Sequence, residues 1–273
     1  MMRPAQCRVE AKMLCLRILS GNTLSLTIGD GIKNMECWIC GDIADSREHL
    51  IKASDIRGYF GNISKERPLY KHTDATDTSI NYRINSTKSN ILKLKSSICQ
   101  KCNNQLTQLY DCAWEILSRY LQAEWPTIVK KGHFSFSNVF TEDTRRYALR
   151  THLYFVKLFG CKILEEKVPI NTGRLSEALI FEKPHSQVFL TFANAPEIPV
   201  DDDQIIFSSR IQFGNYDSCL PDIALWTYML HPVSIRISYL SRSSPHEYRS
   251  RAWHPSQPST QVRLGNYHVS AVK

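Results

Sequence analysis

Apolar residues recur at helical spacing in two long stretches of the chain. In residues 105–125 the apolar positions lie three and four residues apart, which predicts a helix that ends at Pro126. Residues 142–160 carry enough apolar residues for a second helix, with Gly160 as its end. A short helix over residues 172–182 is expected to follow.

Toward the C-terminus the pattern changes to alternation, which is typical of strands. In residues 188–193 and 233–240, every second side chain belongs to one set and the side chains between them to another, which predicts two strands. Residues 200–203 predict an exposed turn. Residues 53–98 are polar and rich in turn formers, which predicts a long connection with weak structure. Residues 245–273 contain several prolines and serines without periodicity and predict a flexible tail.

These patterns indicate an α+β fold made of separate parts. Residues 35–126 are predicted to form a first module. Residues 142–240 are predicted to form an accessory domain of helix and antiparallel strands, and the sequence does not indicate its role. Residues 1–34 read as an extension outside either domain, with Met35 as the expected native start. The hydrophobic fraction of 42% supports a real core in this chain.

The net charge of +8 favours nucleic acid as a partner, because counterions released from an anionic polymer drive binding to a basic protein. A mildly basic balance is also common among soluble proteins, so the charge alone decides little. The apolar run at residues 13–28 is interrupted by polar residues and is too short to span a bilayer. We therefore expect no membrane association. The sequence does not indicate the oligomeric state.

The cysteines indicate a metal site rather than a disulfide framework. Their number, nine, is odd, and four of them form two C-x-x-C pairs while the others are scattered. This usage favours a reducing compartment, so we expect a cytoplasmic location. The pairs are Cys37 with Cys40 and Cys99 with Cys102. Together they can supply four thiolates to one tetrahedral zinc ion, which would be structural because no coordination position stays open. The alternative is that they are buried free thiols.

Residues beside the two cysteine pairs carry candidate chemistry. Glu48 and His49 follow the first pair, and Asn103 and Asn104 follow the second. A closed zinc site would bring these side chains near one another. A neutral imidazole can take a proton from water near pH 7, and carboxylate and amide oxygens are ligands that Mg²⁺ prefers. The set therefore predicts a one-metal hydrolytic site. The asparagines could equally cap the following helix.

The order C-x-x-C, Glu-His-Leu-Ile and C-x-x-C-Asn-Asn over residues 36–125 resembles the HNH endonucleases of the ββα-metal type, in the bacterial branch whose first block usually reads E-H-I-I-P. The resemblance implies a zinc-stapled β-hairpin followed by a helix that grips one divalent ion, and hydrolysis of DNA phosphodiester bonds. It implies His49 as general base and Glu48 with Asn103 or Asn104 as ligands of Mg²⁺ or a similar ion. By analogy it suggests a role in bacterial defence against foreign DNA.

Some positions depart from the family pattern. Lys52 stands where proline is usual, and the middle asparagine of the motif has three candidates, of which Asn90 is preferred over Asn81 and Asn85. The connection between His49 and Asn103 is longer than in compact members, which predicts an insertion.

Lysines around the second cysteine pair form the expected contact surface for phosphate groups. They could also simply be a solvated face. Trp114 and Trp125 are expected in the core rather than as platforms for base stacking. The departures keep an alternative function open: a zinc-knuckle module whose catalytic set has decayed and which binds nucleic acid or protein. The lysines predicted to bind nucleic acid are Lys52, Lys93, Lys95 and Lys101.

Overall fold

In a computed structural model the chain is described from residue 36 onward, as one compact unit. The predicted N-terminal extension, Met35 and the turn at 200–203 lie outside the described residues. The described ranges are 36–74, 79–95, 98–195, 205–215 and 220–265.

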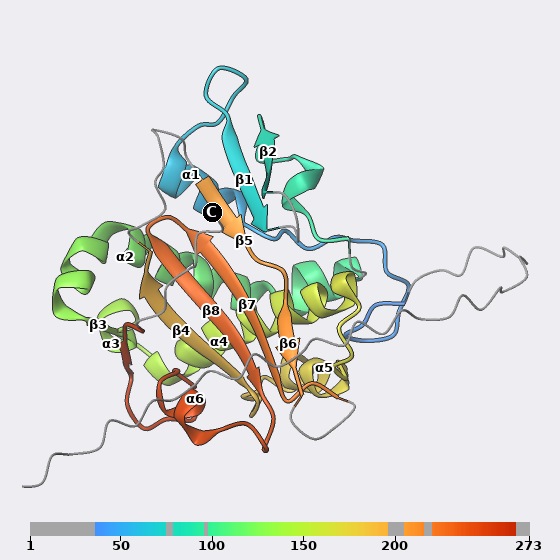
Figure 1. Ribbon diagram of the computed structural model, residues 1–273, viewed down its shortest axis with the longest axis vertical. Coiled ribbons are helices and arrows are strands. Elements are labelled where there is room, and N and C mark those ends of the chain that lie inside the picture. Colours follow the sequence, from blue (N-terminus) through green and yellow to red (C-terminus); the bar gives the residue numbers. More distant parts are fainter. Residues whose placement is uncertain (1–35, 75–78, 96–97, 196–204, 216–219, 266–273) are drawn as a thin grey trace, which may run out of the picture. The chain divides into compact units, whose positions relative to one another are not determined.

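The described part of the chain is a mixed α and β structure built on one large twisted sheet (Figure 1). The strand order is β2-β1-β5-β7-β8-β4, and β6 pairs with β7. Neighbouring strands are antiparallel, except that β1 and β5 are parallel. The short strands β3 and β9 pair separately. The strands are β1 (Leu69–Asp74), β2 (Ser79–Ile84), β3 (His133–Ser135), β4 (Val188–Asn194), β5 (Ile205–Ser208), β6 (Gln212–Gly214), β7 (Ile223–Leu230), β8 (Val233–Leu240) and β9 (Gln261–Arg263).

Two long helices pack against each other and against the sheet strands β4 and β8 (Figure 1). They are α2 and α4, and a π-helical turn, η2, leads into α2. The helical elements are α1 (Ala53–Phe60), η1 (Asn90–Leu92), η2 (Cys102–Leu106), α2 (Gln108–Lys131), α3 (Phe136–Val139), α4 (Thr144–Glu166), α5 (Gly173–Ile180) and α6 (His246–Ser250). Trp114 and Trp125 of α2 are buried, as expected for core residues.

Helix α4 is the centre of this unit, because every residue from 150 to 163 is buried. A helix that is covered on all sides usually carries few charges. Here the buried stretch includes Lys157 and His152, so each needs an internal partner. None of the helices among the described residues is both long and apolar enough to cross a membrane.

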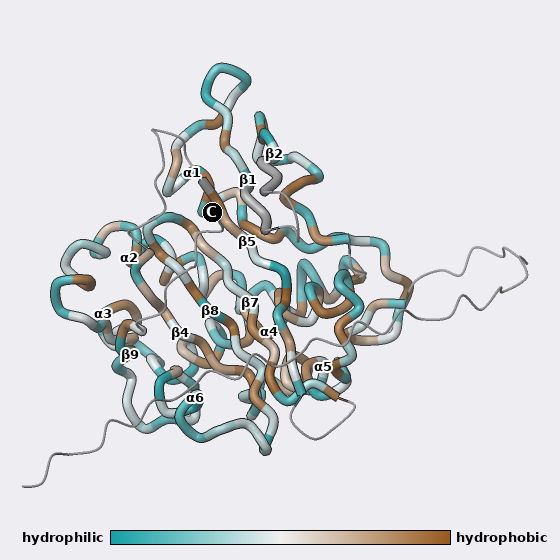
Figure 2. The backbone as a smooth tube through the Cα atoms, in the orientation of Figure 1, coloured by the Kyte–Doolittle hydropathy of each residue, from teal (hydrophilic) through white to brown (hydrophobic). Residues whose placement is uncertain are grey.

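Hydrophobic residues concentrate on the strands that face the two long helices, as the brown segments of β4, β7 and β8 show (Figure 2). Trp226 and Tyr228 of β7 are fully buried. Strands β4 and β8 confirm the two predicted by alternation. Strand β7 was not predicted, because its sequence, Ile-Ala-Leu-Trp-Thr-Tyr-Met-Leu, is apolar on both faces near its end and shows no clean alternation.

Two predicted helix ends are wrong. Helix α2 continues through Pro126 to Lys131 and ends at Gly132 in the left-handed conformation. Proline removes one intrahelical hydrogen bond, but the buried Trp125 and Ile128 on either side hold the helix against the core. Helix α4 passes through Gly160, which lies against the ring of Trp38 rather than at a helix end.

The predicted weak connection at 53–98 in fact holds α1, β1, β2 and η1. The prediction of a flexible tail is wrong for residues 245–265. This segment contains α6 and β9 and packs on the rest of the protein, with Trp253 and Val262 buried. The structure also differs from the predicted division after residue 126, because α2 packs directly on α4 and both contribute to one core cluster. Alternation and turn residues alone did not reveal these long-range contacts.

Candidate zinc centre and the adjoining ionic cluster

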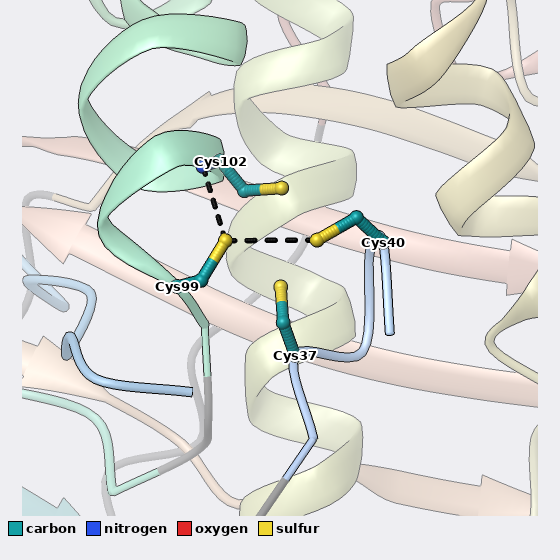
Figure 3. A group of neighbouring side chains, drawn as sticks. All are labelled: Cys37, Cys40, Cys99 and Cys102. Atoms are coloured by element: carbon teal, nitrogen blue, oxygen red, sulfur yellow. Dashed lines mark hydrogen bonds between the residues drawn. The ribbon is translucent and has the colours of Figure 1, made fainter. Parts of the chain in front are cut away.

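Four cysteine side chains from two distant segments converge on one point (Figure 3). Cys37 and Cys40 come from the start of the described chain, Cys102 is the first residue of η2, and Cys99 lies three residues before it. Their Sγ atoms all lie within 4.8 Å of one another. The Sγ atoms of Cys40 and Cys99 are 3.6 Å apart. The cluster predicted from the two pairs is therefore present and could hold a zinc ion.

The spacing of the sulfurs fits tetrahedral zinc. Zn–S bonds of about 2.3 Å place the sulfurs of such a site about 3.8 Å apart. The backbone N–H of Cys102 donates to Sγ of Cys99 over 3.3 Å. Burial raises the pKa of the Cys102 thiol, so binding of a metal ion would release its proton. Four protein ligands leave no open position, and zinc here would stabilise structure rather than take part in chemistry.

The segment between the first two cysteines is fitted closely onto α4 and α5. The indole Nε1 of Trp38 donates to Sγ of Cys161 over 3.3 Å. A Cβ atom at Gly160 would lie 2.4 Å from the ring of Trp38, so only glycine permits this approach. Oγ of Ser176 donates to the carbonyl of Ile39 over 2.6 Å. The cysteine cluster thus joins this segment to η2, and Trp38 joins the same segment to the central helix.

Two extended segments pair beside the cysteine cluster and lead into the helix. Isolated antiparallel bridges join Ser46 to Ile98 and His49 to Lys93. The N–H of Leu94 donates to the carbonyl of Glu48 over 2.8 Å. Helices η2 and α2 follow directly, and α1, β1 and β2 form an insertion between the two segments. The pairing of these segments consists of isolated bridges rather than the regular hairpin that the resemblance implied.

The side chain of Glu48 points to α4 and is only 4% exposed. Its Oε2 lies 3.0 Å from Nζ of Lys157, which also lies 2.7 Å from Oδ1 of Asp111. Burial alone would lower the pKa of Lys157, but the carboxylates of Glu48 and Asp111 raise it above its ordinary value. The lysine therefore stays charged, and Glu48 is neutralised by an internal cation.

A second lysine extends this ionic cluster toward the surface. Nζ of Lys52 lies 2.8 Å from Oε1 of Glu115 and 3.7 Å from Oδ1 of Asp111. Lys52 was predicted to contact nucleic acid, but its ammonium group is already paired with carboxylates inside the protein. The other predicted lysines differ, since Lys95 and Lys101 are exposed and Lys93 is half-buried. We refer to Glu48, Lys52, Asp111, Glu115 and Lys157 together as the ionic cluster.

His49 lies between the ionic cluster and the surface. Burial, followed by the positive charges of Lys93 and Lys52, lowers the pKa of His49 below its ordinary value. The imidazole is therefore neutral at pH 7. In that form it could accept a proton or a hydrogen bond. Its chemistry fits the predicted role of general base, but that role also needs a metal ion nearby.

The side chain of Asn103 makes hydrogen bonds to the two residues that precede Glu48. Nδ2 of Asn103 donates to Oγ of Ser46 over 3.0 Å and to the carbonyl of Arg47 over 3.4 Å. Asn103 thus anchors η2 to the first extended segment. Asn104 and Asn90 are both exposed. Among the described residues, the cysteine cluster is the only group of three or more His, Cys, Asp or Glu side chains that could hold a metal ion.

The sequence analysis did not identify Lys157 as a buried charged residue, although its neighbours in the sequence indicate this. It stands in the run Tyr-Phe-Val-Lys-Leu-Phe-Gly-Cys, where one charge is surrounded by apolar residues. A charge in such a run is either at the surface or paired inside, and paired buried lysines need a carboxylate partner. Asp111 lies on α2, which packs on α4. The pairing with Glu48 could not be predicted, because it depends on how the first segment folds over α4.

Asp55 was also missed. It is 3% exposed and accepts hydrogen bonds from Nε1 of Trp114, Oγ of Ser118 and OH of Tyr228. Burial raises its pKa to about 6, although these donors act in the opposite direction. The carboxyl group joins α1 to α2 and β7. In the sequence Asp55 resembles an ordinary polar residue of a surface helix, so its burial among three hydrogen-bond donors could not be predicted.

In comparisons with known proteins, no family, no curated protein and no solved structure matches this chain. The similarity to HNH endonucleases therefore rests on the motif residues themselves, and of these the four cysteines are the part that the geometry supports.

Proposed function

We propose that this protein is a zinc-stapled DNA-binding protein whose HNH-like module contacts phosphate groups without hydrolysing them. The observation that carries the proposal is the ammonium group of Lys157, which is fully buried between the carboxylates of Glu48 and Asp111. A catalytic Mg²⁺ ion would need the oxygen of Glu48 at about 2.1 Å. The ammonium group of Lys157 already lies 3.0 Å from Oε2 of Glu48, so a metal ion would have to displace it from that carboxylate.

Charge and exposure support the DNA-binding half of the proposal. Lys95 and Lys101 are exposed beside the zinc cluster, and the half-buried Lys93 pairs with His49 across the bridge. The chain as a whole carries a formal charge of +8. Lysines on an ordered backbone position the protein along the phosphate groups of DNA. Each contact with a phosphate group also releases counterions, which favours binding. These contacts give binding with little sequence preference.

The lowered pKa of His49 favours a second candidate function, that of a metal-dependent HNH endonuclease that hydrolyses DNA. A neutral imidazole at pH 7 could activate water. Glu48 and Asn103 would then hold Mg²⁺, and the ammonium group of Lys157 would have to leave Glu48. Its complete burial opposes such a movement.

Two measurements with the full chain test both candidates. Binding of labelled duplex DNA is followed by fluorescence anisotropy over a range of salt concentrations, and plasmid is incubated with the protein and Mg²⁺ or Mn²⁺. We expect salt-dependent binding and intact plasmid. The variant Lys95→Gln with Lys101→Gln should lower the slope of log K against log salt by about 2. Lys65→Gln with Lys130→Gln, at exposed positions on other elements, is the control and should leave the slope unchanged.

Each other outcome has a distinct meaning. Nicking that depends on the metal ion and disappears in His49→Ala would establish the endonuclease and overturn the first proposal. Absence of DNA binding even at about 50 mM salt would overturn both candidates, since a basic phosphate-binding surface binds most strongly at low salt.

A further inference from the structure

The C-terminal segment forms a groove on a part of the molecule that the proposed function does not use. The groove has a volume of about 580 Å³. It lies beside α6 and β9, where the chain is mostly hydrophilic in Figure 2. Its lining includes Arg251, Trp253, Gln257, Gln261, Arg263 and Gly265.

The walls of the groove are held by the core. Trp253 and Leu190 of β4 exchange two backbone hydrogen bonds of 2.7 and 2.9 Å, and the indole of Trp253 is buried. Strand β9 pairs with β3, so that Arg263 lies opposite His133. The N–H of Gly265 donates to the carbonyl of Phe192 over 2.7 Å. The groove is therefore preorganised by contacts to two different strands.

Only glycine permits the last of these contacts. A Cβ atom at position 265 would lie 2.3 Å from Cγ2 of Thr191, so a larger residue would push the wall away from β4. The close approach holds the segment that carries Arg263 against β4.

The charge in the groove is positive and is not neutralised by neighbours. Arg251 and Arg263 are exposed, and neither makes an ion pair within the described part of the chain. Among the described residues, the lining contains no aspartate or glutamate. The eight residues that follow in the sequence, 266–273, contain none either. The amide of Gln261 and the hydroxyl of Ser259 add neutral hydrogen-bond donors to the lining, whereas Oγ of Ser250 and Nε2 of Gln257 already donate to backbone carbonyls.

We propose that this groove binds the phosphodiester backbone of nucleic acid as a second contact surface, separate in the chain from the lysines near the zinc cluster. The inference rests on the proposed function for the identity of the polymer. Guanidinium groups pair with phosphate oxygens through two parallel hydrogen bonds, and amide and hydroxyl donors add neutral contacts. Because the ring of Trp253 is buried, the groove contacts phosphates rather than bases and has little sequence preference.

Substitution of both arginines tests the groove. In the full chain, Arg251→Gln with Arg263→Gln should weaken the binding of duplex DNA several-fold at low salt. The slope of log K against log salt should fall by about 2, or about one unit for each phosphate group that the variant no longer binds. The control is Arg145→Gln with Arg210→Gln, which removes the same charge from two exposed positions outside the groove. Unchanged affinity and slope in the groove variant, with normal binding by the wild type, would overturn this inference and leave the proposed function intact.

A second probe separates the groove from the proposed function. Inorganic tripolyphosphate is titrated into the protein while the indole N–H signal of Trp253 is followed by NMR, because this residue lines the groove. A shift that saturates in the wild type and disappears in the double arginine variant supports a phosphate site, even if duplex DNA does not bind. Absence of any shift in the wild type at low salt would overturn the site.

Discussion

Helix α4 buries polar side chains in two contrasting ways within two turns. At Lys157 the helix carries a charge, which lies 3.0 and 2.7 Å from the carboxylate oxygens of Glu48 and Asp111. At His152 it carries a neutral ring, whose titratable neighbours in the described part of the chain are two further histidines, His185 and His254. The first solution pairs opposite charges, and the second avoids charge altogether.

The histidine cluster is joined by hydrogen bonds to the backbone. Nε2 of His152 accepts from the N–H of His185 over 3.2 Å, and the ring of His254 contacts the carbonyl of His185 through Nε2 over 3.1 Å. The ring centroids of His152 and His254 are 5.2 Å apart. These contacts join α4 to the loop before β4 and to the C-terminal segment. Burial lowers the pKa of all three rings, and the positive charge of Arg174 lowers that of His185 further.

The two regions therefore respond to pH in opposite directions. The pKa of Lys157 is raised in the folded state, so its stabilisation is present below about pH 10.5 and is lost only as the pH rises through the folded value. The histidines have lowered pKa values, so the folded state is fully stable above about pH 6.5. Below that pH the unfolded chain binds more protons, and stability is lost.

The largest loss of folding stability is expected when Lys157 is replaced and its carboxylate partners are kept. Lys157→Met leaves Glu48 buried without a cation, because Glu48 is only 4% exposed. Removal of one partner of a buried ion pair costs about 3–5 kcal/mol. Urea unfolding at pH 7 measures this loss as a fall in the midpoint, with an unchanged dependence on denaturant.

The paired variant serves as the control for this prediction. Lys157→Met with Glu48→Gln removes both charges and should recover much of the lost stability, because an unpaired charge no longer lies in the core. If the double variant is no more stable than Lys157→Met, the loss comes from packing, and the ionic view of this region is wrong.

A smaller, pH-dependent effect is expected in the histidine cluster. The pKa of His185 falls to about 4, so this ring alone should cost about 2 kcal/mol when the pH is lowered to about 5. Urea unfolding between about pH 7 and pH 5 gives the slope. The variant His185→Gln cannot titrate there and should show a shallower fall. Identical slopes in both proteins would mean that acid acts elsewhere in the molecule.

The two regions also differ in how much of them the sequence could reveal. The four cysteines were found because their spacing is itself the chemistry of a metal site: Cys37 and Cys40 present sulfurs from one turn of chain. Glu48 and His49 were found by motif, but their surroundings were not, since these depend on Lys157 from a helix more than a hundred residues away. The sequence gives no sign of the histidine cluster, because His152 and His254 each occur without another histidine nearby in the chain.

Burial on one face or on two does not decide which strands could be predicted. Strands β4 and β8 were predicted, although both are buried on both faces over most of their length. Strand β7 was not predicted, because seven of its eight residues are apolar or aromatic, so the sequence does not show the alternating burial of its first six positions. Gly160 shows a similar limit at the level of one residue. A glycine near the end of an apolar run usually ends a helix, and only the position of Trp38 reveals that it serves close packing here.

That glycine provides the smallest test, at a point on α4 between the zinc cluster and the ionic cluster. In an open helix Gly160→Ala would stabilise by about 1 kcal/mol, but here the new Cβ would lie 2.4 Å from the ring of Trp38. We expect a net loss of about 1–3 kcal/mol and faster transfer of zinc to a coloured chelator, because the segment carrying Cys37 and Cys40 must shift. In Trp38→Ala the ring is absent, and adding Gly160→Ala should then stabilise. If Gly160→Ala destabilises both backgrounds equally, the contact with Trp38 does not set the position of the zinc segment.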